Sequence, residues 1–198
     1  LGLEKFTQVI SDKLSLSPHV FLQLLVLGVI FGLTGKLFAY LLGQLKTSFA
    51  KTFVNPYVRI GVVGLGLSIL LYLIGTGRYT GLGTNLISQS FAGADSKSLI
   101  TGADWILKLL FTVTTIAAGY KGGEVTPLFS IGASLGVWLA PFLGLPVYLV
   151  AALGYAAVFA GATSTTIGPI LIGCEVFGFQ HWPAFLLVCL VATRLFPA

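Results

Sequence analysis

The segment with the clearest chemical potential runs from Gly119 to Ala133, GYKGGEVTPLFSIGA. An apolar stretch ends there, Gly122 and Gly123 interrupt it, and a second apolar stretch follows. Two glycines let the backbone turn sharply, and Pro127 suits the first turn of a helix, where a missing N–H would have had no intrahelical partner. The pattern therefore predicts a helix N-terminus at this point, surrounded by apolar sequence.

Such a helix start is suited to binding an anion. The unpaired N–H groups of the first turn and the positive end of the helix dipole attract negative charge without a full cationic charge, so the anion can also be released. The predicted anion-binding residues are Gly122, Gly123, Glu124, Val125 and Thr126. Lys121 could raise the local anion concentration, although a single lysine beside a helix end is more often an anchor or an ion-pair partner.

The elements that position this segment belong in a membrane. Hydrophobic residues make up 56% of the chain and charged residues 9%, with a mean hydropathy of +0.98, whereas soluble domains are roughly 25% charged. The stretch from Val125 to Cys174 has no ionisable Asp, Glu, Lys, Arg or His, which is long enough for about two spans of ~20 residues. The net charge of +5 is spread over short segments, which argues against nucleic-acid binding and for membrane topology.

Hydropathy predicts an interfacial lead-in over residues 1–19 and a transmembrane helical region over residues 20–198. Several predicted spans are too short to cross a bilayer untilted, so we expect broken helices beside a translocation path. The G-x-x-x-G pairs Gly28/Gly32 and Gly132/Gly136 predict close helix packing. The predicted spans are Val20–Leu45, Val58–Ile74, Leu99–Gly119, Val125–Pro141, Pro146–Gly161, Thr166–Phe177 and Trp182–Phe196, with a Gly-rich insertion at Gly81–Phe91.

The segment GGEVTP, residues 122–127, resembles the signature Gly-Gly-Ile-Phe-x-Pro of the CLC family of anion channels and transporters. Glu124 and Val125 stand where chloride-selective members usually have Ile and Phe, and this departure is similar to the fluoride/proton antiporters. Later features resemble the second inverted half of CLC proteins. These are the break at residues 161–163, the acidic Glu175 and the final helix Trp182–Phe196.

The resemblance implies an all-α membrane protein, the second inverted-repeat half of a CLC-type fold with broken and tilted helices. It implies fluoride/proton antiport, with a chloride channel or chloride/proton antiporter as the alternative, in a multi-pass protein of the bacterial inner membrane. It also implies a homodimer with Ile170–Ile172 and Leu186–Leu190 at the interface. Because the chain contains no Met, we expect it to be part of a longer protein whose first half carries further anion-binding residues.

Glu124 is the predicted proton-coupling residue. An ionised carboxylate beside an anion is repulsive, so it must be protonated, turned away, or alternate between these states. When protonated it can donate a hydrogen bond to fluoride, whose lost hydration must be replaced by good donors, and Thr126 would add a hydroxyl. The alternative is a carboxylate that caps its own helix. Glu175 could relay protons, or it could cap, pair or reach water.

Other classes of function have less support in the sequence. An intramembrane enzyme would need paired acidic residues or a His/Glu metal set, but Glu124 and Glu175 are distant in sequence and lack matching histidines. Cys174 and Cys189 have no second metal ligand at a familiar spacing, so we expect neither a metal nor another cofactor. A purely structural subunit is the third alternative, and the Gly-Gly-x-x-x-Pro helix entry argues against it.

Overall fold

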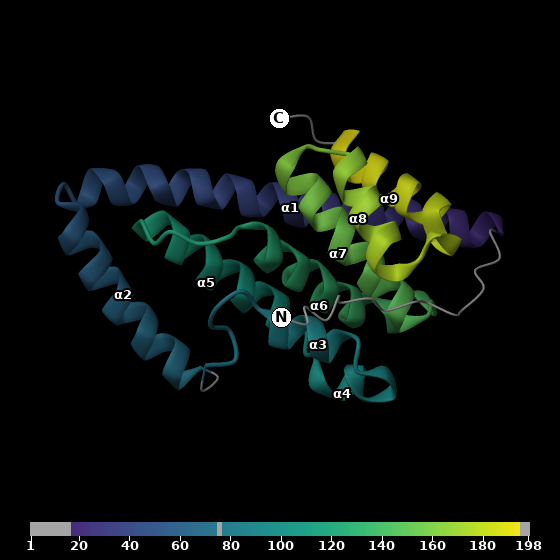
Figure 1. Cartoon of the computed structure of the whole chain (residues 1–198), viewed down its shortest axis with the longest axis horizontal. Coiled ribbons are helices and arrows are strands. Elements are labelled where there is room, and N and C mark those ends of the chain that lie inside the picture. Colours follow the sequence, from purple (N-terminus) through teal and green to yellow (C-terminus); the bar gives the residue numbers. More distant parts are fainter. Residues whose placement is uncertain (1–16, 75–76, 195–198) are drawn as a thin grey trace, which may run out of the picture.

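The computed structural model describes residues 17–74 and 77–194. Most of the predicted lead-in therefore lies outside the described residues, and its last two residues, Pro18 and His19, belong to the first helix. Every regular element in these two ranges is a helix (Figure 1). The elements are α1 (Pro18–Thr52), α2 (Pro56–Leu73), α3 (Thr84–Ser90), η1 (Gly93–Asp95), α4 (Ser96–Leu99), α5 (Asp104–Ala118), α6 (Val125–Leu143), α7 (Val147–Thr163), α8 (Ile167–Phe177), η2 (Phe179–His181) and α9 (Trp182–Arg194).

Helix α1 is longer than the sequence predicted. Its first turn is capped by the Ser17 hydroxyl, which accepts from the N–H of Val20 at 3.3 Å. The helix continues for 35 residues to Thr52, past the predicted end at Leu45, because no Gly or Pro interrupts it there. Lys46, which follows the predicted end directly, therefore lies on the helix.

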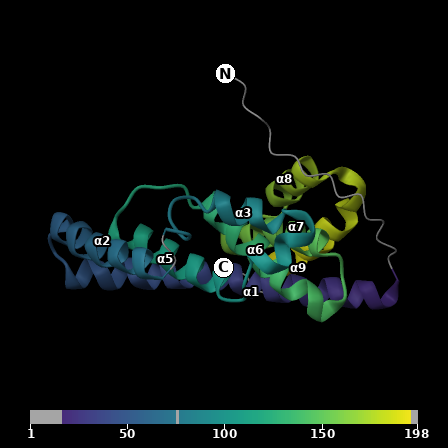
Figure 2. The ribbon, with the colours of Figure 1, turned by 90° about the horizontal axis from the view of Figure 1, so that it is seen from below.

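The long helix α1 runs along the whole molecule, and α2 leaves its C-terminal end at a steep angle (Figure 1). Helix α5 contacts both of them and occupies the angle between them. Helix α7 packs against α1, α6, α8 and α9, so it forms the centre of the other end of the molecule. Figure 2 shows α6 and α7 along one side of α1, with α8 farther from it.

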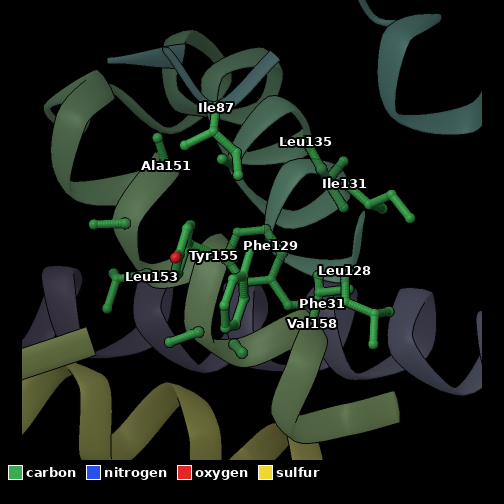
Figure 3. Packing of buried hydrophobic residues seen from close by; sticks show 14 of the residues in the cluster. Phe31, Ile87, Leu128, Phe129, Ile131, Leu135, Ala151, Leu153, Tyr155 and Val158 are labelled. Atoms are coloured by element: carbon green, nitrogen blue, oxygen red, sulfur yellow. The ribbon is translucent and has the colours of Figure 1, made fainter. Parts of the chain in front are cut away.

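The core between α6 and α7 combines aromatic packing with close backbone contact. The Phe129 ring stacks on the Tyr155 ring with centroids 4.0 Å apart, above the buried Phe31 of α1 (Figure 3). Gly132 lies directly against the backbone of Gly154, where a Cβ atom would overlap it.

Both predicted G-x-x-x-G pairs are helix contacts. Gly136 lies against the backbone of α7, as Gly132 does, whereas Gly28 and Gly32 lie against Val191 and Ala192 of α9. The small residues therefore let α6 approach α7 and let α1 approach α9 at backbone distance, as the sequence predicted.

Three described helices are long and apolar enough to cross a membrane, namely α1, α2 and α6, while α7 and α8 are shorter apolar helices.

One predicted span is wrong at its start. Leu99 ends the separate helix α4, and α5 begins only at Asp104, because the Asp104 carboxylate accepts from the backbone N–H of Thr101 at 2.6 Å. The other described spans differ from their predicted bounds by a few residues.

Candidate functional site

The start of α6 presents free backbone donors. Helix α5 ends at Gly119, whose φ of 108° is left-handed, and α6 begins at Val125. The sequence predicted a sharp turn at Gly122 and Gly123. In the structure the left-handed residue is Gly119, where the missing side chain permits this φ. The N–H groups of Val125 and Thr126 have no hydrogen-bond partner among the described residues, because the helical ladder begins with the N–H of Leu128, 3.3 Å from the Glu124 carbonyl.

Glu124 occupies the N-cap position of α6, but its side chain makes no capping hydrogen bond. The capping arrangement considered from the sequence is therefore absent from this structure. Its Oε1 atom lies 3.8 Å from Nζ of Lys46 on α1, and both side chains are about half exposed. An ion pair this exposed contributes little stability, so the carboxylate is held loosely and can change partner.

Three cavities surround the first turn of α6. The Lys108 cavity, of about 260 Å³, is lined by Lys121, Gly122 and Gly123 as well as by Lys108 itself. The Glu124 cavity, of about 240 Å³, lies between Glu124, Lys46 and Thr163, among other residues. The hydroxyl pocket, of about 200 Å³, is lined by Thr84, Ile87, Ser88, Thr126 and Tyr155.

The structure thus gathers most of the predicted site residues around one helix start. Val125 lines none of the three cavities, and its side chain is 41% exposed. Glu175 lies on α8 and also lines none of them. The structure does not bring Glu175 to the site with Glu124.

Lys108 is a residue of this region that the sequence analysis missed. It is 1% exposed, and its ammonium donates to the carbonyls of Tyr79 at 3.0 Å and Gly81 at 2.7 Å. No ion pair joins it to an acidic residue within the described parts of the chain. A lysine in the middle of an apolar span was the available signal, because such charges mark functional or structural sites.

A second buried cluster fixes the same loop, residues 77–83. The Arg78 guanidinium binds Asp104 in a bidentate manner, with Nε to Oδ1 at 2.9 Å and Nη2 to Oδ2 at 3.0 Å. The Tyr79 hydroxyl donates to the same carboxylate at 2.8 Å. Burial raises the pKa of Tyr79 to about 12, and the hydrogen bond to Asp104 raises the pKa of Arg78. Together with Lys108, this cluster holds the loop as one wall of the Lys108 cavity.

No group of three metal-ligating side chains lies together in residues 17–74 and 77–194. Cys174 and Cys189 are buried as free thiols on α8 and α9. The polar groups around the start of α6 are backbone N–H groups, hydroxyls, three lysines and one carboxylate. This set is suited to a small anion and a proton, since N–H and O–H groups donate and a carboxyl group can hold the proton.

Comparison with known proteins agrees with this geometry. Residues 2–196 match the family model described as voltage gated chloride channel. The chain belongs to this family, the CLC family of channels and transporters. A chloride/fluoride channel protein of Pseudomonas syringae pv. tomato is 37% identical over 171 residues, which cover 83% of this chain and 37% of the relative. The chloride channel ClcB of Salmonella typhimurium is 26% identical, covering 98% of this chain and 48% of the relative.

A solved structure shares the fold of this CLC chain. The crystal structure of a CLC-type fluoride/proton antiporter superposes with a TM-score of 0.93 at 55% identity, covering 97% of this chain and 48% of that one. The predicted all-α CLC fold and the predicted integral, multi-pass membrane protein are thereby confirmed. The chain spans about half the length of the relatives that it matches.

Proposed function

We propose that this CLC chain forms part of a fluoride/proton antiporter, in which the free N–H groups of Val125 and Thr126 bind the anion and Glu124 carries the proton. The observation that carries this proposal is the uncapped start of α6. An acidic side chain occupies the N-cap position there, yet it leaves the first-turn amides open to a ligand.

The donor chemistry favours a small and strongly hydrated anion. The amides and the Thr126 hydroxyl are neutral donors beside the positive end of the α6 dipole, so they can replace lost water without trapping the ion. Glu124 is free to leave Lys46, because their contact is long and exposed. When protonated, it can donate a further hydrogen bond to the anion. The protonation of Glu124 and the occupancy of the amide site would then depend on each other.

The similar proteins support fluoride over chloride. The solved structure at 55% identity is a fluoride/proton antiporter, and the Pseudomonas syringae relative at 37% identity is a chloride/fluoride channel protein. The ClcB chloride channels are more distant, at 26% identity for Salmonella typhimurium and 28% for Citrobacter koseri. Chloride transport by the same site is the alternative outcome.

Transport would require more than this chain, because its relatives are about twice as long. We expect it to act with a complementary first half, in a homodimer of the bacterial inner membrane. The predicted contact segments are Ile170–Ile172 and Leu186–Leu190. Their exposed apolar side chains support such a contact, since Leu171 is 55% exposed and Leu186 is 36% exposed.

The test is ion efflux from liposomes that contain the complete protein. Fluoride and chloride efflux are measured with ion-selective electrodes, and proton movement is measured with a pH-sensitive dye in the same vesicles. We expect fluoride efflux faster than chloride efflux, coupled to proton movement in the opposite direction. Glu124→Gln should lose most of the proton coupling, whereas Asp95→Asn, an exposed residue of η1, should keep it.

Two outcomes would contradict this assignment. Faster chloride than fluoride efflux would favour the chloride alternative. If Glu124→Gln kept full coupling, Glu124 would be removed from the proton pathway. A parallel Glu175→Gln variant separates the two acidic candidates, because loss of coupling in that variant alone would place the proton on α8.

A further inference from the structure

We propose that the hydroxyl pocket is a second halide subsite, in which Thr84, Ser88, Thr126 and Tyr155 hold a partly hydrated fluoride ion next to the amides of α6. This inference rests on the proposed transport of fluoride. Three separate elements supply the four hydroxyl groups, namely α3, α6 and α7.

The Tyr155 side chain is held rigidly inside the protein. It is 7% exposed, its ring stacks on Phe129 at 4.0 Å, and the edge-on ring of Phe177 lies 5.3 Å away (Figure 3). Its hydroxyl nevertheless has no hydrogen-bond partner in the described ranges, while the residue lines the pocket. The ring is buried, but the hydroxyl oxygen is accessible from the pocket, so we infer that a ligand or a water in the pocket accepts its hydrogen bond.

The other three hydroxyl groups also lack a hydrogen-bond partner in the described ranges, although Thr84 and Ser88 are exposed and Thr126 is partly buried. Most serine and threonine hydroxyls in the helices of this chain donate to a backbone carbonyl one turn earlier. Examples are Ser90 to Leu86, Thr114 to Leu110, Thr115 to Phe111 and Ser134 to Ser130. The side chains of Thr84, Ser88 and Thr126 make no such bond among the residues described. Their donors are therefore available to an occupant of the pocket.

The chemistry of the pocket favours an anion over a cation. No charged side chain lines it, and Thr126 brings the positive end of the α6 dipole to its edge. Among the described residues, the remaining lining side chain is Ile87, which is apolar. Hydroxyl groups can replace water around a small hard anion, and the phenol of Tyr155 is more acidic than an aliphatic alcohol, so it is a stronger donor.

The volume of the pocket fits an ion that keeps part of its water. About 200 Å³ exceeds the space of a single water molecule, roughly 30 Å³ in the liquid. Thr126 borders the pocket with its side chain and contributes its backbone N–H to the start of α6. The pocket and the amide site therefore share Thr126, so an ion in the pocket could exchange its remaining water for the backbone donors.

Tyr155→Phe in the complete protein is the direct test, because it removes the hydroxyl and keeps the ring stacked on Phe129. Fluoride affinity is measured by calorimetry, and fluoride efflux is measured from liposomes over a range of concentrations. We expect the fluoride Kd and the apparent KM to rise about fivefold or more. This change corresponds to the free energy of one good hydrogen bond. Tyr148→Phe is the matched control on the same helix, because its hydroxyl donates to the Phe91 carbonyl at 3.2 Å, outside the pocket. It should change both constants less than about twofold.

Two results for Tyr155→Phe would decide against the subsite. A Tyr155→Phe affinity within about twofold of the unchanged protein would overturn it. Unchanged affinity with lost proton coupling would also overturn it, because the hydroxyl would then relay protons.

Ser88→Ala, on the outer side of the pocket, should weaken fluoride affinity in the same direction. It replaces Tyr155→Phe if that variant fails to purify as a folded protein. If the unchanged protein binds fluoride but neither variant weakens it, the proposed function stands and the subsite fails. If the unchanged protein neither binds nor moves fluoride, both are overturned.

Discussion

The ammonium group of Lys46, near the end of α1, lies 3.8 Å from the Glu124 carboxylate at the start of α6. The two residues are far apart in sequence and come together because α1 continues past its predicted end. This contact places a cation beside the carboxylate that we propose to carry the proton.

Removing Lys46 should affect ion movement more than stability. Because the pair is half exposed, Lys46→Gln should change the free energy of unfolding by less than about 1 kcal/mol. Loss of a cation near the anion site should slow fluoride efflux at low ionic strength, and the effect should shrink in ~0.5 M salt because of screening. Efflux from liposomes at the two salt concentrations measures this. An equal loss at both concentrations would contradict an electrostatic role for Lys46.

Lys108→Met should loosen the loop over the Lys108 cavity. The substitution keeps a long apolar side chain but leaves the carbonyls of Tyr79 and Gly81 without their buried donor, which should cost about 2 kcal/mol. Hydrogen exchange of residues 77–83 should become faster, and the melting temperature in detergent should fall. The exposed Lys97→Met is the control and should change neither. Unaltered exchange in Lys108→Met would show that the loop is held by Arg78 and Asp104 alone.

Gly132→Ala should separate α6 from α7. The added Cβ would overlap the backbone of Gly154, and neither backbone can move without disturbing the core, so we expect a loss of about 3 kcal/mol. The control is Gly66→Ala on α2, where a Cβ meets nothing within 4 Å and alanine favours the helix by about 0.5–1 kcal/mol. Thermal unfolding in detergent compares the two variants. Equal melting temperatures would argue against close packing at Gly132.

Stability should fall at alkaline pH through Tyr79. Burial raises its pKa to about 12 in the folded protein, above the unfolded value of ~10, so its contribution is complete below pH ~10 and is lost as the pH rises toward 12. The melting temperature of the unchanged protein should therefore decrease more between pH 9.5 and 11 than that of Tyr79→Phe, which has no phenol to ionise. Parallel pH profiles for the two proteins would show that Tyr79 does not contribute.

The sequence predicted the class of protein and the local start of the site. Composition and the uncharged stretch indicated a membrane protein, and the start of α6 fell at Val125 as the glycines and Pro127 suggested. These features depend on neighbouring residues, because hydropathy and helix initiation are local properties of the chain. The end of α1 and the start of α5 were mispredicted, because the first lacks a breaking residue and the second depends on a side-chain contact.

The surroundings of the site were decided by tertiary structure alone. Lys46, Lys108 and Tyr155 lie on three different helices, and no spacing in the sequence relates them to the start of α6. They line three separate cavities around it because α1, α5 and α7 each pack against α6. A local pattern determines where a helix begins and which residues are apolar. Which polar groups share a cavity depends on how distant helices pack, and that follows from the shapes of all their side chains together.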